Sequence, residues 1–322
     1  MEEKVVKILN EMSEYLSIAQ MKKLQEVILK VCAENEVDKA EISNKDFLEM
    51  FLDAKKIEGC SERTLQYYRV TIEHFLSQTE TTVRKVTTEE IRTYLADYQK
   101  NSNCSNVTID NIRRNISSFF SWLEEEDYIL KSPMRRIHKI KTKTVVKSII
   151  SDEGIERLRD NCSEIRDLAM IDLLYSTGIR VGELVNLNID DIDLEGRECI
   201  VYGKGDKERK VYFDAKAKVH LKEYIETRDD SNQALFVTLD APHDRLKISG
   251  VEIRLRQLGR RLDLEKIHPH KFRRTMATRA IDKGMPIEQV QKILGHSQID
   301  TTMQYAMVNQ NNVKTSHQKY MS

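Results

Sequence analysis

Glycine and proline, the residues that most often interrupt helices, are scarce in this chain, with 11 Gly and 4 Pro among 322 residues. Because few positions favour a sharp change of backbone direction, we expect a mainly helical fold, and collagen-like or low-complexity structures are excluded. A hydrophobic content of 40% is enough to build cores. The length suits two ordinary domains.

The cysteines and the N-terminal residues indicate the compartment. The cysteines are odd in number and far apart, and they form no C-x-x-C pair: Cys32, Cys60, Cys104, Cys162 and Cys199. This pattern favours neither a disulfide framework nor a zinc site. The chain starts with an acidic stretch, and no apolar run approaches the roughly 18 residues of a membrane span. We therefore expect a cytoplasmic protein that does not contact membranes and associates with the nucleoid only when bound to DNA.

Charge is balanced overall but segregated along the chain. With 52 basic and 52 acidic residues, the formal net charge is +0, which argues against a polycation that coats nucleic acid. Residues 131–147 nevertheless hold seven bases and no acid, residues 254–279 have a net charge of +7, and residues 148–198 have a net charge of −8. Any binding to DNA should therefore be confined to a defined channel and should weaken steeply with salt.

The spacing of apolar residues divides the chain into four segments. Residues 1–41 show helical spacing that is interrupted near Ser17, which indicates an N-terminal helical extension, either a small cap or a partner-binding helix. Residues 42–130 contain several helical blocks, with start signals at Ser61 and at Thr87-Thr88-Glu89-Glu90. Residues 131–150, which include Pro133, are predicted to form a basic, extended interdomain linker.

Residues 151–322 combine helices with one hairpin. Cys199–Tyr202 and Lys210–Phe213 have the composition of strands, and Gly203–Lys207 forms the turn between them. The fold class expected from these patterns is mainly α with a small antiparallel β-sheet.

Three motifs carry candidate chemistry. In Thr177-Gly178-Ile179-Arg180, Gly178 can end one helix in a left-handed conformation, which places Arg180 at the start of the next helix, where an anion is favoured. Arg180 could instead simply pair with Glu183 or Asp172. The two other motifs are His270-Lys271-Phe272-Arg273, whose first and last residues share a helix face, and Gly295-His296 followed by Tyr305.

Taken in order, Arg180, Lys204, His270 with Arg273, His296 and Tyr305 resemble the tyrosine recombinases, also called phage integrases. The resemblance extends from about Ile42 onward. It implies a helical, SAM-like core-binding domain followed by an α+β catalytic domain that breaks and rejoins DNA. Arg274 departs from the pattern, since many members have His at that position.

The resemblance also implies a role for each residue. Arg180 and Arg273 would bind the oxygens of a DNA phosphate and stabilise the charge of the transition state. Tyr305 would attack, His270 would act as base or orienter, and His296 would hydrogen-bond the phosphate or the attacking oxygen. Lys204 would protonate the leaving 5′ hydroxyl, with Lys207 or Lys210 as alternatives.

The sequence has neither a nucleotide-binding Gly-x-x-x-x-Gly-Lys-Ser/Thr loop nor a two-metal acidic cluster beside these motifs, so we expect no cofactor and no metal.

The expected partner is double-stranded DNA with a specific recombination site. Candidate DNA contacts are basic: Arg69, Arg113, Arg114, Arg135, Arg136, Lys139, Lys141 and Arg274. The free protein should be a monomer or weak dimer that forms a homotetramer on synapsed DNA, with accessory proteins as an open question.

Integration or excision of a mobile element, or inversion, is the expected function. The alternatives are a Xer-type chromosome-dimer resolvase, a relaxing enzyme similar to type IB topoisomerases, and a non-catalytic DNA-binding regulator.

Overall fold

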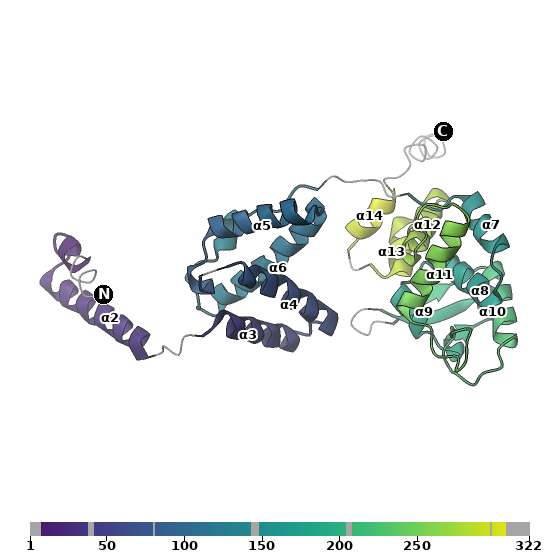
Figure 1. The fold of residues 1–322 in the computed structure, drawn as a ribbon, viewed down its shortest axis with the longest axis horizontal. Coiled ribbons are helices and arrows are strands. Elements are labelled where there is room, and N and C mark those ends of the chain that lie inside the picture. Colours follow the sequence, from purple (N-terminus) through teal and green to yellow (C-terminus); the bar gives the residue numbers. More distant parts are fainter. Residues whose placement is uncertain are drawn as a thin grey trace. The chain divides into compact units, whose positions relative to one another are not determined.

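The computed structural model describes residues 8–37, 42–79, 81–142, 148–203, 208–296 and 298–306, with only the backbone given for 29–37 and 306. The chain divides into two compact units, Met1–Thr144 and Val145–Ser322 (Figure 1). The first is helical, and the second combines helices with a three-stranded antiparallel sheet. This architecture confirms the predicted fold class.

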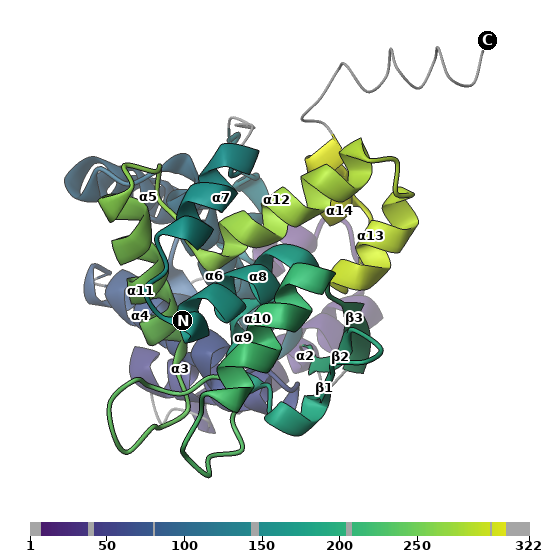
Figure 2. The same ribbon diagram turned by 90° about the vertical axis from the view of Figure 1, so that its right-hand side faces the viewer.

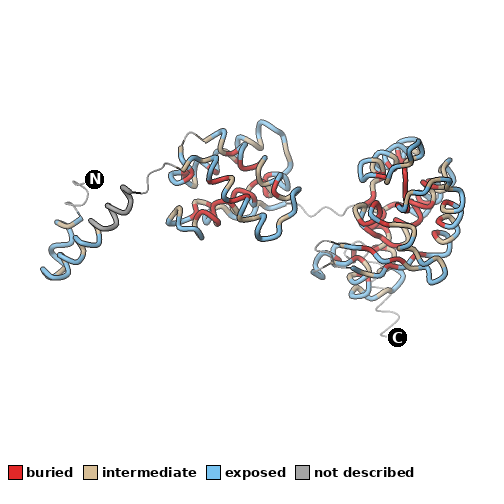
Figure 3. Tube along the Cα trace, turned by 90° about the horizontal axis from the view of Figure 1, so that it is seen from below, coloured by how far each residue is buried: buried red, intermediate tan, exposed pale blue. Residues whose placement is uncertain are grey.

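The N-terminal segment is helical and exposed. Residues 8–12 form a helical turn, residues 13–17 break it, and α2 follows as Ile18–Val37. The break lies where the apolar spacing predicted it, near Ser17. None of the side chains described between residues 8 and 28 is buried, and Ile18 is 83% exposed. Figure 3 shows this segment mainly as exposed and intermediate, in contrast to the buried interiors of the helical bundle and of the second unit.

The helical bundle of the first unit consists of α3 (Asn44–Ile57), α4 (Glu62–Ser77), the 3-10 turn η1 (Val83–Lys85), α5 (Thr88–Ser102) and α6 (Asn106–Glu125). Its helices start where side-chain oxygens can accept from free backbone N–H groups. Ser61 caps α4, and Thr87 with Glu90 forms a capping box at α5, as predicted. The fully buried aromatic rings of the core come from α3, α4 and α6: Phe47, Phe51, Phe75, Phe119 and Phe120.

The basic segment is more ordered than its predicted role as an extended linker implies. Pro133–Arg136 forms a 3-10 turn, η2, and Met134 is 4% exposed in the core of the bundle. Thr88 Oγ1 donates to the carbonyl of Pro133 at 2.7 Å, and the backbone N–H of Ile140 donates to Asp110 Oδ1 at 3.0 Å. The apolar residues between the bases therefore anchor residues 131–142 on the bundle. Lys143 and Lys147 lie outside the described residues.

The second unit is built around α8 (Ile165–Thr177), most of whose residues are buried. Helices α10 and α12 pack against α8, and α13 and α14 pack against α12 and each other (Figure 2). The remaining helical bounds are α7 Asp152–Asp160, α9 Val181–Asn186, η3 Ile189–Asp191, α10 Ala215–Glu226, α11 Ile248–Arg261, α12 Pro269–Asp282, α13 Ile287–Leu294 and α14 Asp300–Ala306.

The sheet has the order β1-β2-β3, with all neighbours antiparallel. The predicted hairpin is β2 (Glu198–Tyr202) and β3 (Glu208–Tyr212), with Cys199 opposite Val211. The third strand, β1 (Ile192–Asp193), was not predicted, because two residues are too few to show an alternating pattern.

We predict that Gly178→Ala destabilises the second unit more than Gly284→Ala does. Both glycines have a positive φ, +63° and +92°, so each alanine incurs roughly 1–2 kcal/mol of left-handed strain. A Cβ at Gly178 would also lie 2.3 Å from Met276 Cε, whereas nothing lies within 4 Å at Gly284. Because Met276 Cε is the end of a flexible side chain and can move aside, overpacking should add only about 1 kcal/mol at Gly178. Urea unfolding measures the free energy of unfolding of both variants. Equal losses of that free energy would contradict the predicted clash at Gly178.

Candidate active site

Arg180 is the cap residue between α8 and α9. Gly178 ends α8 in the left-handed conformation and α9 begins at Val181, as the sequence predicted. The Arg180 guanidinium donates to Glu183 Oε1 at 2.8 Å and to the carbonyl of Gly295 at 3.1 Å. Its side chain remains 42% exposed. The predicted alternative partner, Asp172, is fully buried and bonded to Arg159 and His220 instead.

Glu183 is a buried carboxylate held by two arginines. Arg209, on β3, donates to both of its oxygens at 2.7 Å, and the backbone N–H and guanidinium of Arg180 also donate to it. Burial acts to raise the pKa of Glu183. The hydrogen bonds from Arg209 and Arg180 outweigh that effect and leave the pKa below its ordinary value, so Glu183 is ionised at neutral pH. Sequence reasoning missed Arg209, because its position on a strand gives no sign of Glu183 on a distant helix.

Arg273 is the buried guanidinium of this site, 2% exposed on α12. It donates to the carbonyl of Gly178 at 2.7 Å and to that of Leu294 at 2.6 Å. These carbonyls lie at the C-terminal ends of α8 and α13, where the helix dipoles favour a cation. Burial, followed by the charge of Arg180, lowers the pKa of Arg273 to about 10, so it remains charged at neutral pH.

His296 lies in the turn after α13, which ends at the left-handed Gly295 as predicted. Arg273 Nη2 lies 2.9 Å from His296 Nε2, and because a guanidinium can only donate, Nε2 accepts. The other nitrogen, Nδ1, then carries the proton and donates to Thr302 Oγ1 at 2.9 Å. Burial, and next Arg273 and Arg180, lower the pKa of His296 to about 4. It is therefore a neutral imidazole at pH 7.

Tyr305 is carried by α14 and is 8% exposed. It packs with Ala277, Val290 and Leu294, and its ring centroid lies 6.1 Å from that of His296, with 28° between the planes. Tyr305 is thus a buried residue of the α12–α13–α14 cluster.

The structure brings Arg180, Arg273, His296 and Tyr305 together. His270 is exposed on the first turn of α12, close enough to His296 to be among the groups that lower its pKa. It lines a small cavity of about 250 Å³ with Val181 and Arg256. Lys204 and Lys207 fall outside the described residues; Lys210 is described and pairs with Glu198.

Comparisons with known proteins identify the family of the chain. The phage integrase family matches residues 142–312, and the phage integrase N-terminal SAM-like domain matches residues 47–130. The tyrosine recombinase XerC of Leptospira interrogans is 32% identical over 282 residues, which is 84% of this chain and 91% of that protein. The chain belongs to the phage integrase family of tyrosine recombinases.

Solved structures share the fold. The Tn1549 transposon integrase in complex with a circular intermediate DNA has a TM-score of 0.71 and 18% identity, covering 85% of this chain and 98% of its own. The XerH recombinase in a post-cleavage complex with palindromic difH substrate has a TM-score of 0.68 and 20% identity. The match covers 99% of this chain and 95% of the XerH chain.

The predicted DNA-contact residues of this recombinase fall into two groups. Four are engaged within their own unit: Arg69 with Glu49, Arg113 with Asp110, Arg135 with Glu124, and Arg274, which is 8% exposed, with the carbonyl of Ser148. The others are exposed: Arg114, Arg136, Lys139 and Lys141. A contact with DNA stays a prediction for all eight.

An exposed face of α4 was missed by sequence reasoning. Arg63, Gln66, Tyr67 and Val70 line a shallow cavity of about 640 Å³ near the start of the helix, and Tyr67 is 47% exposed. The signal was available, because three- and four-residue spacing places these side chains on one face. It was passed over because the apolar residues of the same helix were used to locate its buried face.

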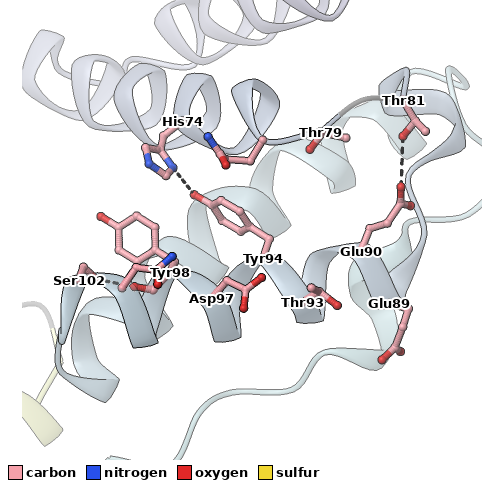
Figure 4. A pocket seen from close by; sticks show the side chains of 12 residues that line it. His74, Thr79, Thr81, Glu89, Glu90, Thr93, Tyr94, Asp97, Tyr98 and Ser102 are labelled. Carbon is pink, nitrogen blue, oxygen red and sulfur yellow. Dashed lines mark hydrogen bonds between the residues drawn. The ribbon is translucent and has the colours of Figure 1, made fainter.

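A cavity of about 790 Å³ lies between α4 and α5 (Figure 4). His74 Nδ1 lies 2.9 Å from Tyr94 Oη at its wall, and Glu89, Glu90 and Asp97 also line it. No lysine or arginine is among the residues that line this cavity. Its charge is thus unsuited to a phosphate backbone.

The part of the chain that the structure describes contains no group of three or more His, Cys, Asp or Glu side chains placed to hold a metal ion. It also contains no helix with the length and hydrophobicity needed to cross a membrane.

We predict that His296 makes stability depend on pH. Its pKa is about 4 in the folded protein and 6.5 as the ordinary value, so the unfolded chain binds the proton more readily. The free energy of unfolding should fall as the pH drops from 6.5 toward 4, and His296→Gln should weaken that dependence. Urea unfolding across this range measures it, with His138→Gln, at an exposed position, as control. Identical pH profiles for wild type and His296→Gln would contradict the assignment.

Proposed function

We propose that this recombinase cleaves and rejoins double-stranded DNA at a specific site through a 3′-phosphotyrosyl intermediate, with the residue roles given below. The observation that carries the proposal is the convergence of Arg180, Arg273, His296 and Tyr305 where α8 and α13 end and α9 begins. These elements are far apart in the sequence, yet Arg180 bonds to the carbonyl of Gly295, Arg273 bonds to His296, and the ring of Tyr305 stacks on that of His296.

Arg180 and Arg273 are suited to binding the scissile phosphate. With Arg209 they carry three positive charges against the one negative charge of Glu183, and His296 is neutral, so the group has a net charge of +2. A phosphodiester carries one negative charge, and the pentacoordinate transition state carries more. Fixed guanidinium groups therefore stabilise the transition state more than the ground state.

Tyr305 is the proposed nucleophile. Its oxygen attacks phosphorus, its proton passes to His270, and the bond from phosphorus to the 5′ oxygen breaks. A tyrosyl phosphodiester forms in place of the DNA phosphodiester, so the bond energy is conserved and religation needs no nucleotide. His296, which is neutral, donates to a phosphate oxygen or accepts from the attacking Tyr305 hydroxyl, and either role requires Nε2 to exchange its bond with Arg273 for the new partner.

The leaving 5′ oxygen requires a proton, and Lys204 is the proposed source. This assignment comes from the family pattern and falls outside the described residues. In the sequence, Lys204 lies between β2, which ends at Tyr202, and β3, which begins at Glu208.

Recognition of DNA is proposed to use α4 and the basic segment, with four copies of the chain on two duplexes. The exposed residues of α4 and the bases of residues 131–141 are suited to contacts with bases and phosphates. The XerH and Tn1549 structures were solved with DNA, and a λ integrase structure is described as a dimer bound to a core site.

The tail, residues 306–322, is proposed to dock on a neighbouring copy, and all but the backbone of Ala306 lies outside the described residues. Loss of recombination with retained binding after its removal would support this docking.

The biological role proposed first is integration or excision of a mobile element, or inversion. A Xer-type resolvase is the second candidate, favoured by the alignment with XerC over 91% of that protein. The DNA recovered on the protein separates them, since two different attachment sites indicate a mobile element and one chromosomal site indicates dimer resolution.

We predict that Tyr305→Phe abolishes a covalent protein–DNA complex but retains DNA binding, because only the attacking hydroxyl is removed. The substrate is obtained by incubating the wild-type protein with a pool of nicked random-sequence duplexes and recovering the DNA that survives denaturation. Gel shift and denaturing gels measure binding and covalent attachment. Tyr202→Phe, at an exposed strand position, is the matched control. Specific binding without any covalent complex would support the non-catalytic regulator, and a complex formed by Tyr305→Phe would exclude Tyr305 as the nucleophile.

We predict that Arg63→Gln weakens binding to the recovered duplex and lowers the slope of log affinity against log salt by about 1, because one phosphate contact is lost. Asp97→Asn, in the acidic cavity, should leave both quantities unchanged. Fluorescence anisotropy over a series of salt concentrations measures them. Equal effects of the two substitutions would exclude the exposed face of α4 as the DNA-binding surface.

A further inference from the structure

Arg209 connects three elements of the active site. Its side chain is 13% exposed and lies on β3, the second strand of the hairpin. Two of its nitrogens donate to Glu183 on α9 at 2.7 Å, and Nε donates to the carbonyl of Ile293 in the last turn of α13 at 2.8 Å. One planar guanidinium thus fixes a strand, the start of one helix and the end of another.

The same side chain supports the turn that carries His296. A Cβ at Gly295 would lie 3.0 to 3.3 Å from Cδ, Nε and Cζ of Arg209. The backbone of Gly295 therefore packs on Arg209, and the carbonyl of Gly295 receives a hydrogen bond from Arg180. Displacing Arg209 would move both the acceptor of Arg180 and the residue before His296.

Arg209 also determines how Glu183 interacts with Arg180. With Arg209 bidentate on its two oxygens, Glu183 needs only one side-chain hydrogen bond from Arg180. Without Arg209, a buried carboxylate would have Arg180 as its only side-chain partner among those described, and it would hold that guanidinium more tightly. The net charge of the group would also fall from +2 to +1.

We propose that Arg209 is a positioning residue that keeps Arg180 available to the scissile phosphate and fixes the turn before His296. Each of its three nitrogens already donates to Glu183 or to the carbonyl of Ile293, so its assigned role acts through Arg180 and the turn before His296 rather than through contact with the phosphate. The inference rests on the proposed function, since it assigns Arg180 to a phosphate oxygen.

The test compares Arg209→Lys with wild type on two versions of the recovered duplex, one with a normal scissile phosphate and one with a methylphosphonate at that position. The methyl group replaces one charged oxygen, so a correctly placed Arg180 contributes less to cleavage of that DNA. Lysine keeps the charge but cannot form the planar bidentate pair. We expect single-turnover formation of the covalent complex to fall about 100-fold on the phosphate and by a much smaller factor on the methylphosphonate.

Arg245→Lys is the matched control. Arg245 is a partly buried arginine of the same unit that donates to the carbonyls of Val185 and Leu187 and to Asn188. The Arg245→Lys substitution should lower cleavage of both substrates by the same small factor. Thermal melting verifies that each variant is folded. Glu183→Gln provides a second variant: it removes the carboxylate that orients Arg180, so Arg180 is misplaced by loss of its partner and the loss of cleavage should again be selective for the phosphate.

The outcomes are distinguishable. Equal losses on both substrates by Arg209→Lys and Glu183→Gln, or no loss by either, would overturn the positioning role while leaving the recombinase function intact. Failure of the wild-type protein to form any covalent complex on validated DNA would overturn the proposed function itself. A selective loss on the phosphate by both variants supports the inference.

Discussion

The interaction on which the catalytic unit depends is the burial of the Arg273 charge between two helix ends. A guanidinium that is 2% exposed needs acceptors, and the carbonyls of Gly178 and Leu294 supply them. Both carbonyls lie where a helix ends at a left-handed glycine, Gly178 or Gly295. The helix ends therefore hold the cation, and the cation holds the helix ends at a fixed separation.

From this arrangement the properties of the neighbouring groups follow. His296 accepts from Arg273 and is kept neutral, because a proton on its ring would lie beside a buried positive charge. Glu183 is kept ionised by Arg209 and Arg180, so the site combines one fixed negative charge with three positive charges. The result is a rigid, positively charged group suited to a phosphate.

Sequence reasoning located the local features correctly. The left-handed Gly178, the helix starts at Arg180 and Ser61, and the hairpin at Cys199 depend on interactions within a few residues, so their patterns can be read directly. Sequence reasoning was less accurate for residues 131–150, which it predicted to form an extended, basic linker. There Met134 and Ile140 pack on the helical bundle, and the burial of isolated apolar residues within a charged run depends on distant partners.

The sequence by itself therefore determined the helical class, the hairpin, the chain order of the catalytic motifs and their assignment to a recombinase family. Only the tertiary structure decided which charges meet. Glu183 binds Arg209 from a strand, Asp172 binds Arg159 instead of Arg180, and Arg69 and Arg113 pair within the bundle. The physical reason is that hydrogen bonding in a helix or hairpin is local in sequence, whereas the pairing of buried charges depends on packing between elements that are far apart in the chain.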